Sequence, residues 1–362
     1  MRGLKALVIT VGLLIALAVG FFFFKGFQPE IIVSAEKLWH FGPINITNGM
    51  LTGLFSALIT CLFMWLGARR TALVPRGAQN FVEAVFEWML GIVEDVAGKN
   101  GRRFFPAIAS IFLFILISNW LGLLPIYNAI GVTENKYVEV KEKLEADPNA
   151  PYTLGKFDAV IVDRSSLATI GSKPPHVIVE LPAGLTNEQA LEQIAAAVEE
   201  KTHGDPSKVP ATLIPLFRST NSDVNMPLAI AFWSFIFVEY WGLSTLGLGY
   251  LKKFFNPSAL LHFRVIDLFV GVLEFLSELI RIVSFTFRLF GNIFAGEVLL
   301  LFMTFLVPFL APTVFYGLEL FVGFIQAAVF ALLTLVFAVM AVESHAEEGH
   351  GEAEAAAHGT HA

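Results

Sequence analysis

The chain has 362 residues, of which 56% are hydrophobic and only 15% are charged, and its mean hydropathy is +0.68. Several apolar runs reach the roughly 20 residues that a helix needs to cross a bilayer, which excludes an ordinary soluble enzyme. The net charge of −7 comes largely from a polar insertion and an acidic tail. A single cysteine, Cys61, excludes an intramolecular disulfide and a cysteine metal cluster. The sequence also contains no phosphate-binding glycine loop and no Ser/His/Asp triad.

Residues 1–26 have the pattern of a secretory signal, because Arg2 and Lys5 precede a long apolar run. The sequence leaves open whether this segment is cleaved as a signal peptide or kept as an N-terminal anchor. Residues 27–130 are predicted to form an N-terminal membrane region. Its first part, residues 27–46, is expected to be an amphipathic approach to the bilayer.

Five runs are predicted to be core membrane helices, which makes the fold class an all-α polytopic membrane protein. They are Asn48–Gly67, Phe104–Leu124, Met226–Gly247, Arg264–Leu310 and Thr313–Val342. The fourth run is too long for a perpendicular crossing, so the last two runs are predicted to form a long tilted helical hairpin. Residues 77–97 place apolar side chains at helical spacing with acids among them. This segment is predicted to be an additional amphipathic helix along the membrane surface.

Residues 131–220 are a polar insertion of different character. The segment KPPHVIVELP indicates a strand, and LTNEQALEQIAAAVEEK indicates a helix that Thr186 or Asn187 caps, with Gln189 or Glu188 in its first turn. The insertion is therefore predicted to be a small extramembrane α/β element, whose role the sequence does not indicate.

Basic residues gather at helix ends on one predicted side of the membrane. They are Arg69, Arg70, Arg76, Lys99, Arg102, Arg103, Lys252 and Lys253. The positive-inside rule assigns this side to the cytoplasm, so the 131–220 insertion is predicted to be extracytoplasmic and the acidic tail (343–362) cytoplasmic. The tail histidines are His345, His350, His358 and His361. Their loose spacing favours a solvated tail over a metal site.

Arg288 lies in the middle of the fourth apolar run, with no acidic residue within five positions. A charge at the centre of a membrane helix costs about 2.5–3.5 kcal/mol on insertion scales, so it is a functional-site hypothesis by default. The structural alternative is an arginine that extends to the interface. About a full span of mostly apolar residues follows Arg288 on the outer side, which disfavours that alternative.

Acidic and amide side chains follow Arg288 toward the outer side. When the last two helices are folded antiparallel about a turn near Pro308, Glu297 faces Glu319 and Arg288 faces the helical turn that begins at Gln326. Such a series of acids inside a membrane is typical of a proton relay. Glu297 is nine residues from Arg288, half a turn out of phase, so the two cannot share a face of a straight helix.

Polar residues also lie at the outer end of the Met226–Gly247 span. Asp223, Asn221 and Asn225 could extend the path there, with helix capping as the alternative role. On the inner side of Arg288, Glu274 is a candidate for an inner aqueous path.

Two further patterns lie on the helix of Arg288. Glu278 and Arg281 have the i,i+3 spacing of a local ion pair. An i,i+4 stripe runs through Ser284, Arg288 and Asn292.

Two polar paths separated by one fixed positive charge imply a relay through a second protein. A proton from outside cannot pass Arg288 directly, because two positive charges in a low-dielectric site repel strongly. A mobile carboxylate on another protein would have to carry the proton around it. The membrane potential supplies about 2.3 kcal/mol per proton per 100 mV.

Three segments resemble signature segments of subunit a of F-type ATP synthases. They are FRLFGNIFAGE (287–297), FIQAAVFALLTLVF (324–337) and PLFRSTNSDVNMPLAIAF (215–232). The resemblance covers most of the chain outside residues 1–30, 131–210 and the tail. It implies a proton-translocating stator subunit of the bacterial inner membrane, with two offset half-channels in residues 221–342 and no nucleotide chemistry of its own.

The resemblance also assigns roles to single residues. Arg288 would face the essential carboxylate of the c-ring, Asn292, Glu297, Glu319 and Gln326 would belong to the outer half-channel, and Glu274 to the inner one. Asp223 on the outer side and Ser284 on the inner side complete the candidate site. Glu319 stands where some members carry histidine.

The implied partners are the c-subunit ring, the b subunits of the peripheral stalk, the other Fo and F1 subunits and the lipid bilayer, with no nucleic acid. No cofactor and no metal is expected, and the transported ion is expected to be H⁺, with Na⁺ left open.

The sequence disfavours two other classes of function. An ion-coupled secondary transporter would also place charges at the membrane midplane, but such proteins often show paired halves with broken helices, and the sequence contains no internal repeat. A pure scaffold would not need Arg288, Glu297 and Glu319 within the bilayer.

Overall fold

The computed structural model describes residues 35–41, 44–68, 77–124, 127, 131–146, 156–163, 176–181, 186–205, 207–253, 265–306 and 310–343. The predicted signal or anchor (1–26) and the tail histidines lie outside these residues. The chain divides into two compact units. The membrane unit consists of residues 1–35, 52–123 and 219–362, and the sheet unit consists of residues 36–51 and 124–218.

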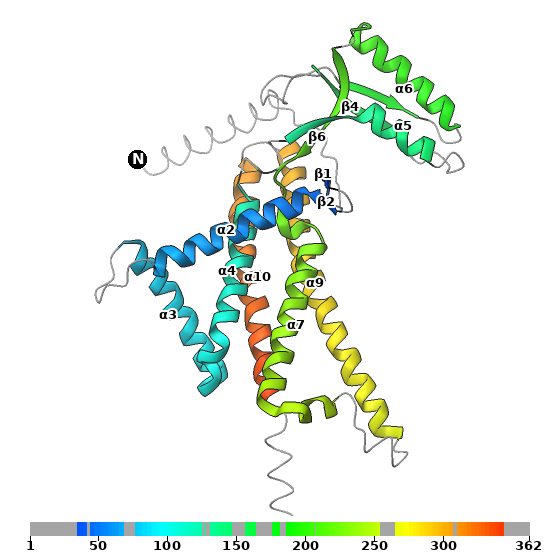
Figure 1. Cartoon of the computed structure of the whole chain (residues 1–362). Helices are drawn as coiled ribbons and strands as arrows, with labels where there is room; N and C mark the ends of the chain where they lie inside the picture. Colours follow the sequence, from blue (N-terminus) through cyan, green and yellow to red (C-terminus); the bar gives the residue numbers. More distant parts are fainter. Residues whose placement is uncertain are drawn as a thin grey trace, which may run out of the picture. The chain divides into compact units, whose positions relative to one another are not determined.

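The membrane unit is helical throughout its described part (Figure 1). Its elements are α2 (Asn48–Ala68, whose first turn belongs to the sheet unit), α3 (Ala78–Ala97), η1 (Gly98–Asn100), α4 (Gly101–Gly122), η2 (Thr220–Ser222), α7 (Asn225–Leu246), η3 (Gly247–Lys253), α9 (Val265–Leu306) and α10 (Leu310–Glu343). Five candidate spans are long and apolar enough to cross a membrane, and α3 and α4 belong to one of them. The predicted class, an all-α polytopic membrane protein, is confirmed.

Helices α3 and α4 lie against each other and meet at η1 (Figure 1). Buried Met89 and Val93 of α3 belong to the same apolar core as Phe104 and Ile108 of α4. The helix expected at residues 77–97 is therefore present. Its position along the membrane surface stays a prediction.

Helix α9 is one continuous helix of 42 residues. At 1.5 Å per residue it is about 63 Å long, roughly twice the thickness of a bilayer core, so it must tilt strongly in a membrane. Helix α10 packs against α4, α7 and α9. The core between these helices includes Phe285 and Leu289 of α9 with Ala327 and Phe330 of α10.

The sheet unit contains a four-stranded antiparallel sheet in the order β3 (Gly131–Asn135), β6 (Lys208–Pro215), β4 (Lys156–Asp163), β5 (His176–Glu180). Helices α5 (Lys136–Ala146) and α6 (Asn187–Thr202) supply the other half of its core. Phe157, Ile161 and Val177 of the sheet are buried with Val140 of α5 and Ile194 of α6. The expected strand is β5 and the expected helix is α6, whereas β3, α5, β4 and β6 were not predicted.

The start of α6 is a capping box of the predicted kind. The Thr186 hydroxyl accepts from the backbone N–H of Gln189, and the Gln189 side chain accepts from the backbone N–H of Thr186. Part of residues 27–46, the predicted amphipathic approach, forms an antiparallel hairpin of β1 (Lys37–Phe41) and β2 (Ile44–Thr47). In β2, two isoleucines alternate with Asn45 and Thr47, a pattern that favours a strand.

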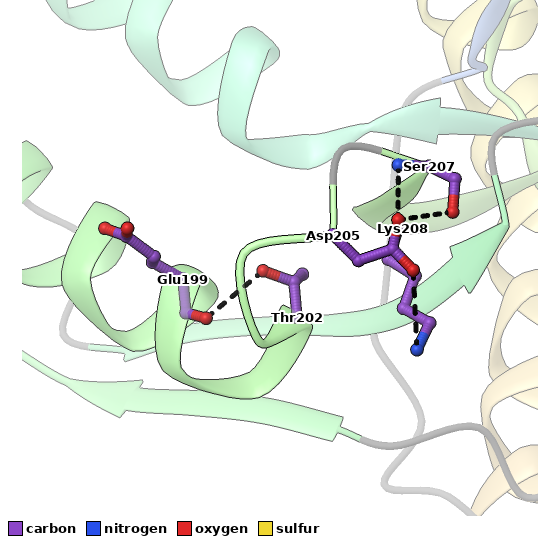
Figure 2. Close-up of polar contacts among 5 residues, drawn as sticks. All are labelled: Glu199, Thr202, Asp205, Ser207 and Lys208. Carbon is purple, nitrogen blue, oxygen red and sulfur yellow. Dashed lines mark hydrogen bonds and ion pairs between the residues drawn. The ribbon is translucent and has the colours of Figure 1, made fainter.

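The turn between α6 and β6 is held by short-range polar contacts (Figure 2). The Asp205 carboxylate accepts hydrogen bonds from the backbone N–H of Ser207 at 3.0 Å and from its hydroxyl at 2.7 Å. Lys208 Nζ lies 3.8 Å from the other carboxylate oxygen. The serine hydroxyl, the serine N–H and the lysine together hold the pKa of Asp205 below its usual value.

Candidate functional site

A polar stripe runs along one face of α9. Its members are spaced by three, four or seven residues: Glu274, Glu278, Arg281, Arg288 and Asn292. Arg288 is half-buried, and its guanidinium carbon lies 5.8 Å from the centre of the Phe285 ring. Among the residues that the structure describes, none forms an ion pair with Arg288. The charge at the centre of the stripe is therefore not neutralised by a described acid of this chain.

The antiparallel register expected for the last two helices is present in the structure. The Asn292 amide of α9 donates a 2.7 Å hydrogen bond to Oε1 of Gln326 on α10. The centres of the Phe285 and Phe330 rings lie 4.8 Å apart. This contact, about two turns closer to the Val265 end of α9, fits the same antiparallel register. Gln326 is buried, and its Nε2 has no hydrogen-bond partner among the described residues. A buried amide donor without a partner is a place where a water molecule can accept a hydrogen bond.

Glu319 of α10 is buried and lies against Gly296 of α9. The sequence predicted that Glu297 faces Glu319, and Gly296, the neighbour of Glu297 in the chain, lies against that carboxylate. Glu297 itself is half-buried. Glu319 of α10 and Asn292 of α9 thus both lie at the interface between these helices, within two helical turns of each other.

Asp223 lies one residue before Val224, the N-cap of α7. Its carboxylate accepts hydrogen bonds from the backbone N–H and the side-chain amide of Asn225 at the start of α7. Asn221 points instead toward α4, where its amide donates to Ser118 Oγ at 2.8 Å and to Asn119 Oδ1 at 2.7 Å. These bonds join η2 to α4.

Asn119 was not predicted as a site residue. Its amide donates to the backbone carbonyl of Gly323 at 3.1 Å, one turn before Gln326 on α10. Together, Asn221, Asn119 and the Gly323 carbonyl form a buried polar connection from η2 to α10. No local sequence pattern indicates these contacts of Asn119, and only the packing of α4 on α10 reveals them.

A second polar cluster lies nearer the Val265 end of α9. Glu278 is buried and forms the expected ion pair with Arg281, at 2.5 Å. Tyr250 of η3 is fully buried and donates a 3.2 Å hydrogen bond to Glu239 of α7. Burial, with the negative charges of Glu239 and Glu278, raises the pKa of the Tyr250 phenol.

The predicted inner residues are less enclosed than this cluster. Glu274 is half-buried and Ser284 is exposed. Tyr250 and Glu239 were missed because η3 folds back onto α7, a tertiary contact with no local sequence signal. Gly242 permits this contact, since a Cβ atom there would lie 2.6 Å from the Tyr250 ring.

Among the described residues no three His, Cys, Asp or Glu side chains are placed to hold a metal ion. The tail histidines, where a metal site was weighed against a solvated tail, are outside the described part.

Membrane-length helices with an arginine and a buried carboxylate in their interiors define a class, the polytopic membrane proteins that carry charged groups within the bilayer. In this class such groups mark ion and proton pathways. The family model described as ATP synthase A chain matches residues 50–171 and 193–339, and the chain belongs to that family.

Curated relatives agree with this assignment. The chain is 25% identical over 314 residues to the ATP synthase subunit a of Moorella thermoacetica, with 86% of this chain and 99% of the relative covered. It is 27% identical over 325 residues to the ATP synthase subunit a of Gloeobacter violaceus, covering 88% and 95%. A third relative, ATP synthase subunit a 1 of Pelobacter propionicus, is 25% identical over 293 residues, covering 81% and 85%.

The resemblance based on the Arg288 segment and its two companion segments is therefore confirmed. The family is that of a membrane component of ATP synthases, in keeping with the expectation that no nucleotide chemistry takes place on this chain.

Proposed function

We propose that this chain is the proton-translocating stator subunit a of an F-type ATP synthase. The fixed positive charge of Arg288 would face the carboxylates of a c-subunit ring and favour the release of their protons, and two offset half-channels would connect that site to the two sides of the membrane. Proton flow would then be coupled to rotation of the ring and to ATP synthesis. The relatives named ATP synthase subunit a support the assignment to this complex.

The observation that carries the proposal is the lack of an ion pair at Arg288 among the described residues. An intramembrane guanidinium is costly without a counter-charge. A carboxylate on a neighbouring protein would supply that charge, and a ring of such carboxylates would supply it repeatedly as the ring turns.

The surface beside Arg288 supports a protein neighbour. An exposed apolar ridge runs along α9 with spacings of three and four residues: Phe269, Leu273, Leu276, Ile280, Val283 and Phe287. The ridge ends next to Arg288. A partner helix that packs on it would bring its own side chains within reach of the guanidinium.

We assign the outer half-channel to Asp223, Asn292, Glu297, Glu319 and Gln326, and the inner one to Glu274 and Ser284. The buried carboxylate of Glu319 and the Asn292–Gln326 hydrogen bond support a polar path along the α9–α10 interface toward Arg288. We include Asp223 in this outer half-channel because it is two residues from Asn221 in the chain. Its carboxylate also accepts a hydrogen bond from Asn225 at the start of α7.

The transported ion would be H⁺, with no cofactor. The partners would be the c-ring, the b subunits of the peripheral stalk and the remaining Fo and F1 subunits. The chain would lie in a bacterial inner membrane with a cytoplasmic C-terminus and an extracytoplasmic 131–220 insertion. Labelling of single cysteines in 131–220, in a Cys61→Ser background, tests the orientation, since labelling from the cytoplasmic side would contradict it.

The test of the mechanism is ATP-driven proton pumping in inverted membrane vesicles that carry Arg288→Ala. The expected result is loss of pumping with normal amounts of assembled complex. Arg102→Ala is the matched control, because that arginine is exposed and forms only a surface ion pair with Glu94. Normal pumping by assembled Arg288→Ala complexes would make Arg288 structural and would refute the proposed mechanism.

A further inference from the structure

The polar stripe of α9 is interrupted at one position. Arg281 and Arg288 are seven residues apart and therefore share a face, and Phe285 stands between them on that face. Phe285 is 4% exposed. An apolar ring thus separates the polar cluster of Glu278 and Arg281 from Arg288 and Asn292.

Phe285 belongs to an aromatic group formed with α10. Its ring centre lies 4.8 Å from that of Phe330 and 5.9 Å from that of Phe337. Phe330 is 1% exposed. Leu289, one turn further along α9, is fully buried beside this group. The aromatic group is therefore tightly packed on the face of α9 that carries the polar stripe.

A small cavity lies on the Arg281 side of the aromatic group. Arg281, Ser234, Phe285 and Phe337 contribute to its wall, and its volume is ≈ 10 Å³, close to the least that one water molecule needs. The Arg281 guanidinium lies over the Phe337 ring at 3.7 Å. Phe285 and Phe337 of the aromatic group thus line the same cavity as Arg281.

Among the described residues, two hydroxyl groups on α7 and α10 near the aromatic group are engaged in internal hydrogen bonds. Thr334 donates to the backbone carbonyl of Phe330 at 2.9 Å, and Ser234 and Thr334 are 2.7 Å apart. Either hydroxyl can be the donor in the Ser234–Thr334 pair. Both hydroxyls are thus bound to groups of this chain, and Thr334 also bonds to the Phe330 carbonyl of its own helix.

We propose that Phe285, Phe330 and Phe337 form a dry aromatic barrier that stops protons from crossing within this chain between the Glu278–Arg281 cluster and Arg288. This inference rests on the proposed function, in which protons must travel on the ring. The charge of Arg288 repels a proton, whereas the barrier excludes the water that would bring one. A serine in place of a barrier phenylalanine leaves a cavity with a polar wall, which water can occupy.

The test uses assembled Fo in vesicles stripped of F1, with c-subunits that carry an amide in place of the ring carboxylate. Ring-dependent proton transfer is then blocked, and any remaining flux crosses subunit a itself. Vesicles with the unaltered chain are expected to stay proton-tight, and Phe285→Ser or Phe330→Ser vesicles are expected to dissipate an imposed pH gradient. Proton-tight vesicles with either assembled variant would overturn the barrier.

Two variants serve as controls. Phe285→Leu keeps an apolar side chain and is expected to restore tightness. Phe321→Ser changes an exposed phenylalanine of α10, 62% accessible, and is expected to cause no leak. A leak of equal size from Phe321→Ser would show that any serine on this helix pair loosens the complex, and would overturn the assignment to the barrier.

A second measurement covers the case in which the serine variants do not assemble. In a Cys61→Ser background, Phe285→Cys is expected to be unreactive toward a water-soluble thiol reagent from both sides of the membrane. Glu274→Cys and Asn292→Cys, on the same stripe to either side, are expected to react. Reaction at Phe285→Cys would overturn the barrier. Failure of the proposed function is seen separately, as normal pumping by Arg288→Ala.

Discussion

Gly296 of α9 lies so close to the Glu319 carboxylate of α10 that a Cβ atom at this position would overlap both carboxylate oxygens. The glycine therefore makes room for a buried acid on the neighbouring helix. We predict that Gly296→Ala displaces Glu319 and slows proton uptake through the outer half-channel. The reason is that proton transfer becomes slower when a group on its path is moved out of position. ATP-driven pumping and passive flux through Fo measure the effect.

The same helix offers a matched control for Gly296→Ala. Gly291 has no atom within 4 Å of an added Cβ, so Gly291→Ala is expected to assemble and pump normally, with the small gain that alanine brings to a helix. Glu319→Gln is expected to slow uptake as well, because it removes the carboxylate without filling space. Unimpaired flux in both Gly296→Ala and Glu319→Gln would remove Glu319 from the path.

The hydrogen bond between Asn292 and Gln326 leads to a prediction of non-additivity. If the pair acts as one unit, Asn292→Ala and Gln326→Ala should each reduce pumping, and the double variant should be little worse than the more impaired single variant. Groups in direct contact typically show a coupling of about 0.5–3 kcal/mol in such a cycle. Pumping rates of the four proteins, normalised to assembled complex, give the coupling. Strictly multiplicative losses would mean that the two amides act independently.

Asn119 connects three segments of the membrane unit. We predict that Asn119→Ala destabilises this unit by about 1–3 kcal/mol, because the Asn221 amide and the Gly323 carbonyl lose a buried partner. Thermal unfolding of the purified complex, followed by protease sensitivity of the chain, measures the change. Trp120→Phe is the comparison, since it removes one hydrogen bond to the Leu320 carbonyl from a residue that is 42% exposed. An equal or larger loss for Trp120→Phe would contradict the prediction.

The parts of the structure that the sequence predicts well are those with local signals. Apolar runs of membrane length locate the spans, and the helical repeat locates α3. The approximate register of α9 against α10 could also be derived, because only three residues separate the two helices in the sequence and few alternatives are left. That register placed Arg288 opposite the turn that begins at Gln326, whereas in the structure Gln326 bonds to Asn292, one turn further along α9.

The missed parts depend on contacts between distant segments. Strand β6 pairs with β3 and β4, which lie many residues before it, so no local pattern reports the pairing. Tyr250 reaches Glu239 only because η3 folds back over Gly242. Asp223 and Asn221 illustrate a further limit, since both types are good helix caps and good path residues. The contacts in the structure distinguish the two residues, because Asp223 bonds to Asn225 at the start of α7 and Asn221 bonds to α4.

The turn at Asp205 gives the sheet unit a predicted dependence on pH. The hydrogen bonds from Ser207, with Lys208 nearby, lower the pKa of the folded carboxyl. A group whose pKa is lower in the folded state contributes stability above its unfolded pKa, about 3.9 for aspartate, and loses it as the pH falls through the folded value. We expect the turn between α6 and β6 to open more readily below about pH 4. The contribution is small, because the carboxylate is largely solvated.

Hydrogen exchange of the full chain at several pH values tests this expectation. In the unaltered chain, protection of the amides around Ser207 should fall as the pH drops below the aspartate range, after correction for intrinsic exchange. Asp205→Asn should show low protection at all of these pH values, because an amide cannot gain the ionic part of the contact. Ser207→Ala should lie between the two, since it removes the hydroxyl donor and keeps the backbone N–H. A pH dependence that persists unchanged in Asp205→Asn would assign it to another group and contradict the prediction.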